Sequence, residues 1–184
     1  GYAEMLKHGL ISEEGHWAEL MTFDMDHPDY GKLQQLVGES VQIKERIVAQ
    51  DPFEQGIRKA LNLGHTIGHA FESFALEREA PVLHGYAVAW GMVCELYLAH
   101  QKTGFPTDKM RQTVQFIKEN YGKLAFNCRD YDRLYEFMKH DKKNAAAGMI
   151  NFTLLGGIGD IRINQTATKE EINEALDFYC ETMG

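Results

Sequence analysis

The stretch HGYAVAWGMVCELYLAHQ (residues 84–101) decides the fold, because a helix drawn through it is apolar on almost every side. A helix of this kind is stable only where other parts of the protein cover it all round. The sequence therefore predicts a buried helix over these residues, with the other segments packed against it.

Helical patterns lie on both sides of this stretch. They cover residues 2–11, 12–23, 30–50, 65–78, 107–121, 131–140 and 168–183. Ser12 is expected to be the N-cap of the second helix, and Thr168 with Glu171 fits a capping box. In residues 30–50 the expected apolar stripe consists of Leu33, Val37, Val41, Ile43, Ile47 and Val48.

Two breaks interrupt the helical pattern. Asp51-Pro52 ends a helix, and residues 53–62 read as a polar linker. Residues 149–164, MINFTLLGGIGDIRIN, contain two β-rich runs around Gly-Gly-Ile-Gly, which is typical of a hairpin. The predicted fold is therefore mainly α, a helical bundle-like domain with one small β-hairpin.

The composition is that of a globular protein. Of the 184 residues, 44% are hydrophobic and 25% are charged. The net charge of −8 argues against nucleic acid and against anionic membrane surfaces as partners. No apolar run approaches the length of a membrane span.

The cysteines and the N-terminus indicate where the chain works. Cys94, Cys128 and Cys180 are widely spaced and form no C-x-x-C pair, which argues against a zinc ribbon or a redox motif. An odd number of cysteines without a signal peptide predicts a cytoplasmic protein. The chain begins without Met and inside a helical pattern, so it is expected to be a fragment of a longer protein.

Histidines form the first candidate site. In LNLGHTIGHAFE (residues 61–72), His65 and His69 are four residues apart and share a face of the predicted helix. The pair is compatible with half of a divalent metal site, with a proton-transfer pair, or with two histidines that merely line a helix. A third histidine, His84, begins the buried helix.

Glycines and acidic residues accompany these histidines. Gly64, Gly68 and Gly85 are expected to let another backbone or a substrate come close. A catalytic zinc ion keeps three protein ligands, and two histidines and one carboxylate would suit it. The candidate carboxylates are Glu4, Glu54 and Glu72; otherwise Glu4 forms a solvated ion pair with Lys7, and Glu72 is a surface acid.

Basic side chains near breaks and turns are candidates for binding an anionic substrate. A site for a carboxylate and a phosphate needs several cations. The candidates are Lys44, Arg58, Lys142 and Lys143, each of which is otherwise solvated surface.

Four segments carry a family resemblance. They are AEMLKHGLI (3–11), KERIVAQDPFEQGIRKALNLGHTIGHAFE (44–72), HGYAVAWGM (84–92) and DKKNAAAGMINFTLLGGIG (141–159). In this order, over nearly the whole chain, they resemble the C-terminal, metal-binding half of the 3-dehydroquinate synthase family. Nothing in the chain resembles the N-terminal α/β domain with which that family binds NAD.

The resemblance implies an activity. The family converts 3-deoxy-D-arabino-heptulosonate 7-phosphate, a phosphorylated keto-sugar acid, into 3-dehydroquinate and phosphate in the shikimate pathway. Residues 1–184 would be its C-terminal helical metal- and substrate-binding domain, with Zn²⁺ or Co²⁺ as the metal. The expected partners are the N-terminal NAD-binding domain and a second copy in a homodimer, and this chain alone is expected to be inactive.

The resemblance also implies roles for individual residues. The metal ligands would be Glu4, His65 and His84. The catalytic groups would be His69, which handles a proton, Glu54, a proton acceptor, and Lys7. The substrate-binding groups would be Lys7, Lys44, Arg58, Asn62 and His69, together with one of Lys142 and Lys143.

Two departures from the family pattern are visible. Tyr86 stands where the family often has Glu, and the spacing from His65 to His84 is longer than in some members. The extra residues are expected in the loop before Pro81.

Three other interpretations remain. The first two are related sugar-phosphate cyclases and metal-dependent alcohol or glycerol dehydrogenases, which also place histidines on helices. The third is a helical binding module without catalysis. Lys7, Lys44, Arg58 and the DKKN segment favour a phosphorylated and carboxylated substrate over that of a plain dehydrogenase. A purely structural zinc site is disfavoured, since it would be closed by four ligands, often cysteines.

Overall fold

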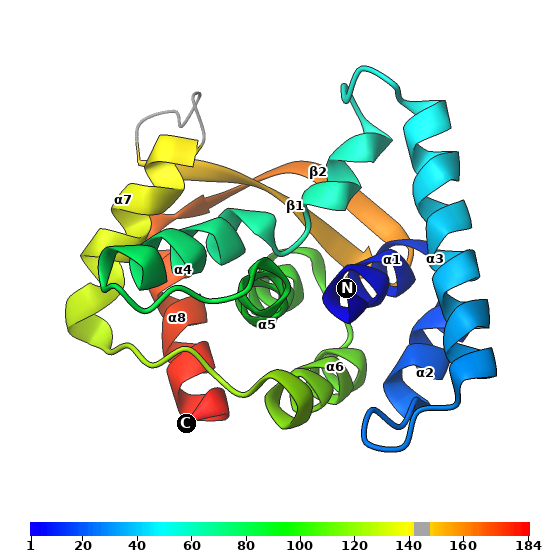
Figure 1. The fold of residues 1–184 in the computed structure, drawn as a ribbon. Coiled ribbons are helices and arrows are strands. Elements are labelled where there is room, and N and C mark those ends of the chain that lie inside the picture. Colours follow the sequence, from blue (N-terminus) through cyan, green and yellow to red (C-terminus); the bar gives the residue numbers. More distant parts are fainter. Residues whose placement is uncertain (142–147) are drawn as a thin grey trace.

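Helix α5 (His84–Thr103) lies in the middle of the fold (Figure 1). Every residue from Ala87 to Leu96 is buried, so the predicted buried helix is confirmed. Helices α1 (Tyr2–Ser12), α4 (His65–Glu77), α6 (Thr107–Tyr121) and α8 (Lys169–Met183) surround it and contact it. The apolar sides of these helices meet on α5 in one hydrophobic core.

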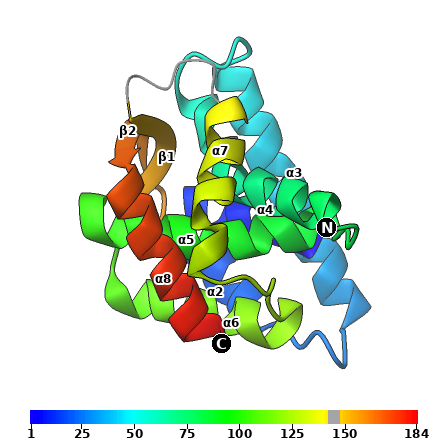
Figure 2. The same ribbon diagram turned by 90° about the vertical axis from the view of Figure 1, so that its left-hand side faces the viewer.

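The structure, a computed structural model, describes residues 1–141 and 148–184. Lys142 and Lys143, predicted to bind substrate, lie outside the described residues. The remaining elements are α2 (Glu14–Thr22), α3 (Tyr30–Gln50), the 3₁₀ helices η1 (Ile57–Asn62) and η2 (Cys128–Asp130), α7 (Tyr131–Asp141), β1 (Met149–Gly157) and β2 (Asp160–Thr168). Figure 2 shows α4, α7 and α8 on one side of the fold, with the hairpin beside them.

The hairpin of β1 and β2 packs on α5 through β1. Ile150, Phe152, Leu154 and Leu155 of β1 are buried, whereas β2 alternates between exposed and half-buried residues over most of its length. The strands turn within the predicted Gly-Gly-Ile-Gly segment, where Gly159 has a φ of 81°. The predicted fold class, a mainly helical domain with one small β-hairpin, is therefore confirmed.

Two local predictions at helix ends gave opposite results. The capping box is confirmed, because Thr168 accepts from the Glu171 N–H and Glu171 accepts from the Thr168 N–H. The N-cap at Ser12 is wrong. Ser12 ends α1 and its hydroxyl donates to the His8 carbonyl at 2.6 Å, while Glu13 stands before α2.

The segment 53–62, expected to be a linker, forms η1 from Ile57 onward. Ala60 is fully buried there, and η1 contacts α1, α3 and both strands. The sequence did not reveal this element, because a 3₁₀ helix of six residues is too short to show an apolar stripe among polar side chains.

The predicted stripe on α3 is wrong in part. Its buried residues are Leu36, Ser40, Ile43 and Ile47. Val37 and Val41 are 42% and 48% exposed. Ser40 takes a core position because its hydroxyl lies 2.7 Å from Nδ1 of the buried His8, so both polar groups are satisfied.

Helices α4 and α5 approach so closely that their backbones touch through glycines. A Cβ at Gly68 would lie 3.0 Å from the Ala87 carbonyl oxygen, and one at Gly64 would lie 2.9 Å from the Val88 carbonyl oxygen. The expectation that Gly64 and Gly68 admit another backbone is therefore confirmed. A Cβ at Gly85 would meet nothing closer than 3.9 Å, so close packing does not require glycine there.

Among the described residues, no helix has both the length and the apolar character that crossing a membrane would require.

Candidate functional site

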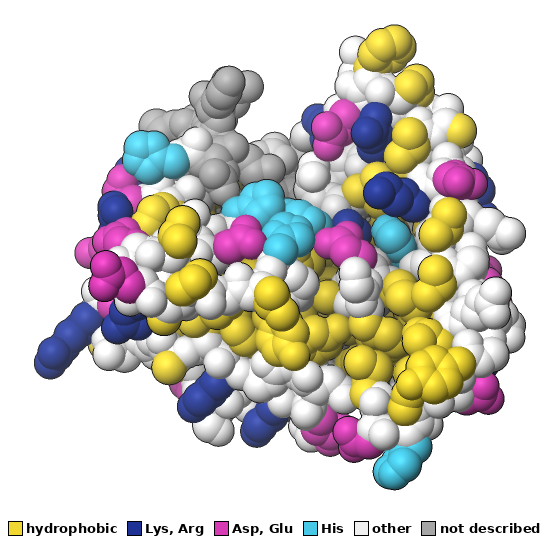
Figure 3. Space-filling view, viewed as in Figure 1, with side chains coloured by type: hydrophobic (Ala, Val, Ile, Leu, Met, Phe, Trp, Pro, Cys, Tyr) yellow, Lys and Arg dark blue, Asp and Glu magenta, His cyan; other side chains and the backbone are white. Residues whose placement is uncertain are grey.

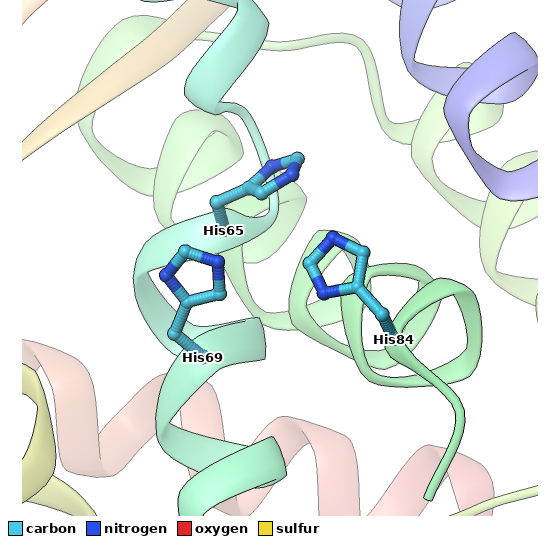
Figure 4. A group of neighbouring side chains, drawn as sticks. All are labelled: His65, His69 and His84. Atoms are coloured by element: carbon cyan, nitrogen blue, oxygen red, sulfur yellow. The ribbon is translucent and has the colours of Figure 1, made fainter.

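Three imidazoles meet where α4 passes α5. His65 and His69 lie on the same face of α4, with ring centroids 5.3 Å apart, and His84 comes from the first turn of α5. The His84 ring centroid lies 5.4 Å from that of His65 and 5.7 Å from that of His69. One ligand atom from each ring falls within 4.8 Å of the others, and Figure 4 shows the rings facing one another. The prediction that His65 and His69 share a face is confirmed.

Neighbouring oxygens determine which ring nitrogens carry protons. Nδ1 of His65 lies 3.2 Å from the Leu63 carbonyl oxygen, and Nδ1 of His84 lies 3.1 Å from a Glu72 carboxylate oxygen. These oxygens accept hydrogen bonds but donate none, so a proton on each Nδ1 would leave Nε2 with the lone pair that a metal ion needs. Glu72 is thus more than the surface acid that the sequence suggested.

Glu4 of α1 joins the cluster from a third helix. Its Oε1 lies 3.4 Å from Nε2 of His65, and its Oε2 accepts a hydrogen bond from Lys7. Burial alone would raise the pKa of the Glu4 carboxyl, but the hydrogen bond from His65 and the Lys7 ammonium reverse this effect and hold the pKa well below its usual range. Glu4 is therefore an anion beside the imidazoles.

Lys7 is only 4% exposed, so a solvated ion pair with Glu4 is the wrong interpretation. Its ammonium also donates to the Leu61 carbonyl oxygen at 2.8 Å, which ties α1 to the segment before α4. Burial lowers the pKa of Lys7, and the nearby Lys44 adds to the effect, whereas Glu4 opposes it. A buried cation therefore lies directly behind Glu4.

Figure 3 shows a group of histidine side chains at the centre of one face of the molecule, and His65, His69 and His84 form the described cluster of this kind. Acidic side chains lie on both sides of this central group, and basic side chains lie beside it toward η1 and α3. Imidazole, carboxylate and basic side chains therefore open onto the same surface.

The loop after α3 and the 3₁₀ helix η1 that follows it hold three more predicted residues. The Asp51 carboxylate accepts hydrogen bonds from the N–H groups of Gln55, Gly56 and Arg58, and these bonds lower its pKa. Asn62 donates to Glu54 at 3.1 Å, and the Arg58 guanidinium donates to the Pro52 carbonyl oxygen at 2.9 Å. Glu54 has a φ of 55°, an uncommon backbone conformation for this residue type.

Lys44 lies on α3 and lines a cavity of about 600 Å³ between α1 and α3. Glu4, His8 and Ser40 line the same cavity, so Lys44 is on the Glu4 side of the site.

The buried His8 side chain should make the free energy of unfolding depend on pH. Burial, with the charge of Lys7, lowers the pKa of His8 from 6.5 to about 4. Between these two values the unfolded chain binds more protons than the folded chain, so acid favours unfolding. The free energy of unfolding is expected to fall by roughly 3 kcal/mol at most as the pH drops through this window. Urea denaturation of the metal-free chain at pH 7 and pH 4.5 measures the loss.

The variant His8→Gln is the control for this loss, because glutamine can bond to Ser40 without titrating. Its stability should decrease less between the two pH values than that of the original chain. Equal decreases would show that His8 is not responsible.

Sequence reasoning overlooked one acidic residue near the histidines and did not predict the contact made by another. Glu72 was considered only as a possible ligand or a surface acid, although it hydrogen-bonds His84. Glu95 was overlooked, and it is 1% exposed on α5, where its carboxylate accepts from the N–H groups of Gly64 and Ile67. The available signal for Glu95 was a single acidic residue in an otherwise apolar stretch.

The chain is similar in sequence to known enzymes. The family model described as "3-dehydroquinate synthase C-terminal" matches residues 1–144. The 3-dehydroquinate synthase of Parabacteroides distasonis is 61% identical over 184 residues, which are 100% of this chain and 52% of that protein. That of Bacillus pumilus is 35% identical, covering 96% of this chain and 48% of that protein. The chain thus spans about half the length of the curated relatives it matches.

Solved structures share the fold. A 2-deoxy-scyllo-inosose synthase complexed with carbaglucose-6-phosphate, NAD⁺ and Co²⁺ superposes with a TM-score of 0.75 at 21% identity, covering 95% of this chain and 49% of that one. A 2-epi-5-epi-valiolone synthase from Streptomyces hygroscopicus with NAD⁺ and Zn²⁺ bound gives 0.73 at 20% identity, covering 97% and 50%. Since the family model covers most of the chain and the fold agrees, this chain belongs to the 3-dehydroquinate synthase C-terminal domain family.

Proposed function

We propose that this chain is the metal- and substrate-binding part of a 3-dehydroquinate synthase, a lyase that converts 3-deoxy-D-arabino-heptulosonate 7-phosphate into 3-dehydroquinate and phosphate. The observation that carries the proposal is the meeting of Glu4, His65, His69 and His84, which come from three helices. The 61% identity to the Parabacteroides distasonis enzyme supports it.

A divalent metal ion is part of the proposal, with Glu4, His65 and His84 as ligands. These residues offer two imidazole nitrogens and one carboxylate, a donor set that suits Zn²⁺ or Co²⁺ in a catalytic site. When bound, the ion supplies positive charge that stabilises a substrate oxyanion. The Zn²⁺ and Co²⁺ in the structures of similar fold support this choice of metal.

The other site residues would handle the substrate's anionic groups. Lys7 and Lys44 are cations on the Glu4 side of the site, and Arg58 lies in η1; the three would hold the carboxylate and hydroxyl groups of the substrate. His69, Asn62 and one of Lys142 and Lys143 would orient the phosphate. Phosphate loss breaks a C–O bond after a proton leaves the neighbouring carbon; His69 would assist that transfer, and Glu54 would accept a proton elsewhere in the cycle.

Partners complete the proposal. An N-terminal NAD-binding domain would supply the reversible oxidation that makes the substrate C–H acidic, and the whole enzyme would be a homodimer in the cytoplasm. Cys94, Cys128 and Cys180 are all free thiols, which fits a reducing compartment.

A chimera tests the activity. The chain is joined to the half of the Parabacteroides distasonis relative that it does not match, and phosphate release from 3-deoxy-D-arabino-heptulosonate 7-phosphate is measured with NAD and Zn²⁺. We expect turnover by the chimera, none by the chain alone, and no net NADH, because the ketone is reduced again within the cycle.

Two alternative substrates separate the rival functions. Glucose 6-phosphate tests a cyclase of the kind that binds carbaglucose-6-phosphate, and glycerol tests a metal-dependent dehydrogenase. Faster phosphate release from glucose 6-phosphate, or NADH formation from glycerol, would overturn the assignment.

A further inference from the structure

Glu95 binds the start of the helix that carries His65 and His69. It lies on α5, is 1% exposed, and uses both carboxylate oxygens. Oε1 accepts a hydrogen bond from the Gly64 N–H at 3.0 Å, and Oε2 accepts one from the Ile67 N–H at 3.1 Å. A charged side chain from the central helix thus holds the first turn of α4.

The first N–H groups of a helix have no carbonyl partner within it, and the side chain of the N-cap residue usually accepts from them. The N-cap of α4 is Gly64, whose φ of 82° suits glycine and which has no side chain to accept with. Glu95 supplies the missing acceptor from a neighbouring helix. Its negative charge also lies at the positive end of the α4 dipole.

The two hydrogen bonds lie on either side of His65, the first residue of α4. The His65 ring is oriented by the Leu63 carbonyl, which belongs to the same turn of backbone. A change in the backbone between Leu63 and Ile67 would therefore redirect the imidazole. Because α5 also carries His84, Glu95 links the backbone at His65 to the helix that places the other ring.

We propose that Glu95 is a positioning residue, which acts on the metal centre through the backbone of α4 and sets the direction of the His65 imidazole relative to His84. The inference rests on the proposed function for its metal, and it adds a residue that lies outside the ligand set.

The test compares the Glu95→Ala and Glu95→Gln variants with the original chain. Titration with Co²⁺ gives the affinity, and the visible absorption of bound Co²⁺ reports the geometry of its ligands. We expect Glu95→Ala to bind Co²⁺ about 10–100-fold more weakly with a shifted spectrum, as happens when residues that orient metal ligands are removed. Glu95→Gln keeps one oxygen acceptor, so its loss should be smaller, and this variant decides the question if Glu95→Ala does not fold.

Thr168→Ala is the matched control, because it removes a side-chain cap from α8, away from the histidines. It should lower the thermal midpoint but leave the Co²⁺ affinity and spectrum unchanged. If both Glu95 variants also lower only the thermal midpoint, Glu95 is a structural cap and the inference is wrong.

A measurement without metal separates this inference from the proposed function. Nitrogen-15 NMR of the metal-free chain identifies which His65 nitrogen carries the proton. The original chain should show one set of His65 ring-nitrogen signals, and both Glu95 variants should show a changed distribution of the proton between Nδ1 and Nε2. Absence of Co²⁺ binding by the original chain would overturn the proposed metal centre, whereas an unchanged tautomer in both variants would overturn the role of Glu95.

Discussion

Replacing His65 with alanine is expected to abolish tight zinc binding by the chain, with an affinity loss of more than about 100-fold. His65 lies between the other candidate ligands, because its Nε2 is 3.4 Å from Glu4 and its ring packs against the rings of both other histidines. Elemental analysis should find about one zinc per original chain and almost none in His65→Ala. Circular dichroism shows whether the variant keeps its helices.

The proposed ligand set makes a further distinction. His84→Ala and Glu4→Gln should also lose zinc, whereas His69→Ala should retain it, because His69 is assigned to the phosphate and a proton. His69 is nevertheless within the group whose ligand atoms lie within 4.8 Å of one another. If His69→Ala loses zinc and Glu4→Gln keeps it, the metal has three imidazole ligands and the proposed set is wrong.

Replacing Gly91 with alanine is expected to destabilise the chain by about 3 kcal/mol. A Cβ at Gly91 would lie 2.2 Å from the Gly64 carbonyl oxygen and 2.6 Å from the Gly68 nitrogen. Both obstacles are backbone atoms of the segment that places His65 and His69, so no side-chain rotation can relieve the contact. The helices must separate, and the loss outweighs the gain of up to about 1 kcal/mol that alanine brings to a helix. Urea denaturation measures the difference.

Gly38→Ala is the matched control, since Gly38 lies within α3 and a Cβ there would meet nothing within 4 Å. This variant should be as stable as the original chain or slightly more stable. Zinc affinity should fall in Gly91→Ala and stay unchanged in Gly38→Ala. A Gly91→Ala chain with the original stability would show that the two helices are not in backbone contact.

Much of the secondary structure was predictable because its causes are local. The apolar run after His84 predicted a buried helix, and the spacing of His65 and His69 predicted a shared face. Thr168 and Glu171 form a capping box three residues apart, which involves no distant partner. Such features depend on the periodicity of the backbone and on hydrogen bonds between near neighbours.

Predictions failed where a distant partner changed the role of a residue. Ser40 is in the core because it meets His8 from another helix, while Val37 and Val41 remain exposed beside the cavity. Lys7 is buried because Glu4 and the Leu61 carbonyl oxygen satisfy its ammonium. Side-chain type alone places such residues incorrectly, since the free energy of burying a polar group depends on its partner.

The sequence by itself determined the α-helices, the hairpin and, through the family resemblance, the candidate ligands. Only the tertiary structure brought Glu4 and His84 to the histidines of α4, and only it showed that Glu72 contacts His84 and that Glu95 binds the first turn of α4. The physical reason is that helical periodicity determines which residues share a face, whereas the packing of α1, α4 and α5 determines which faces meet. Backbone contact through Gly64, Gly68 and Gly91 fixes the approach of α4 to α5, and with it the distance between their imidazoles.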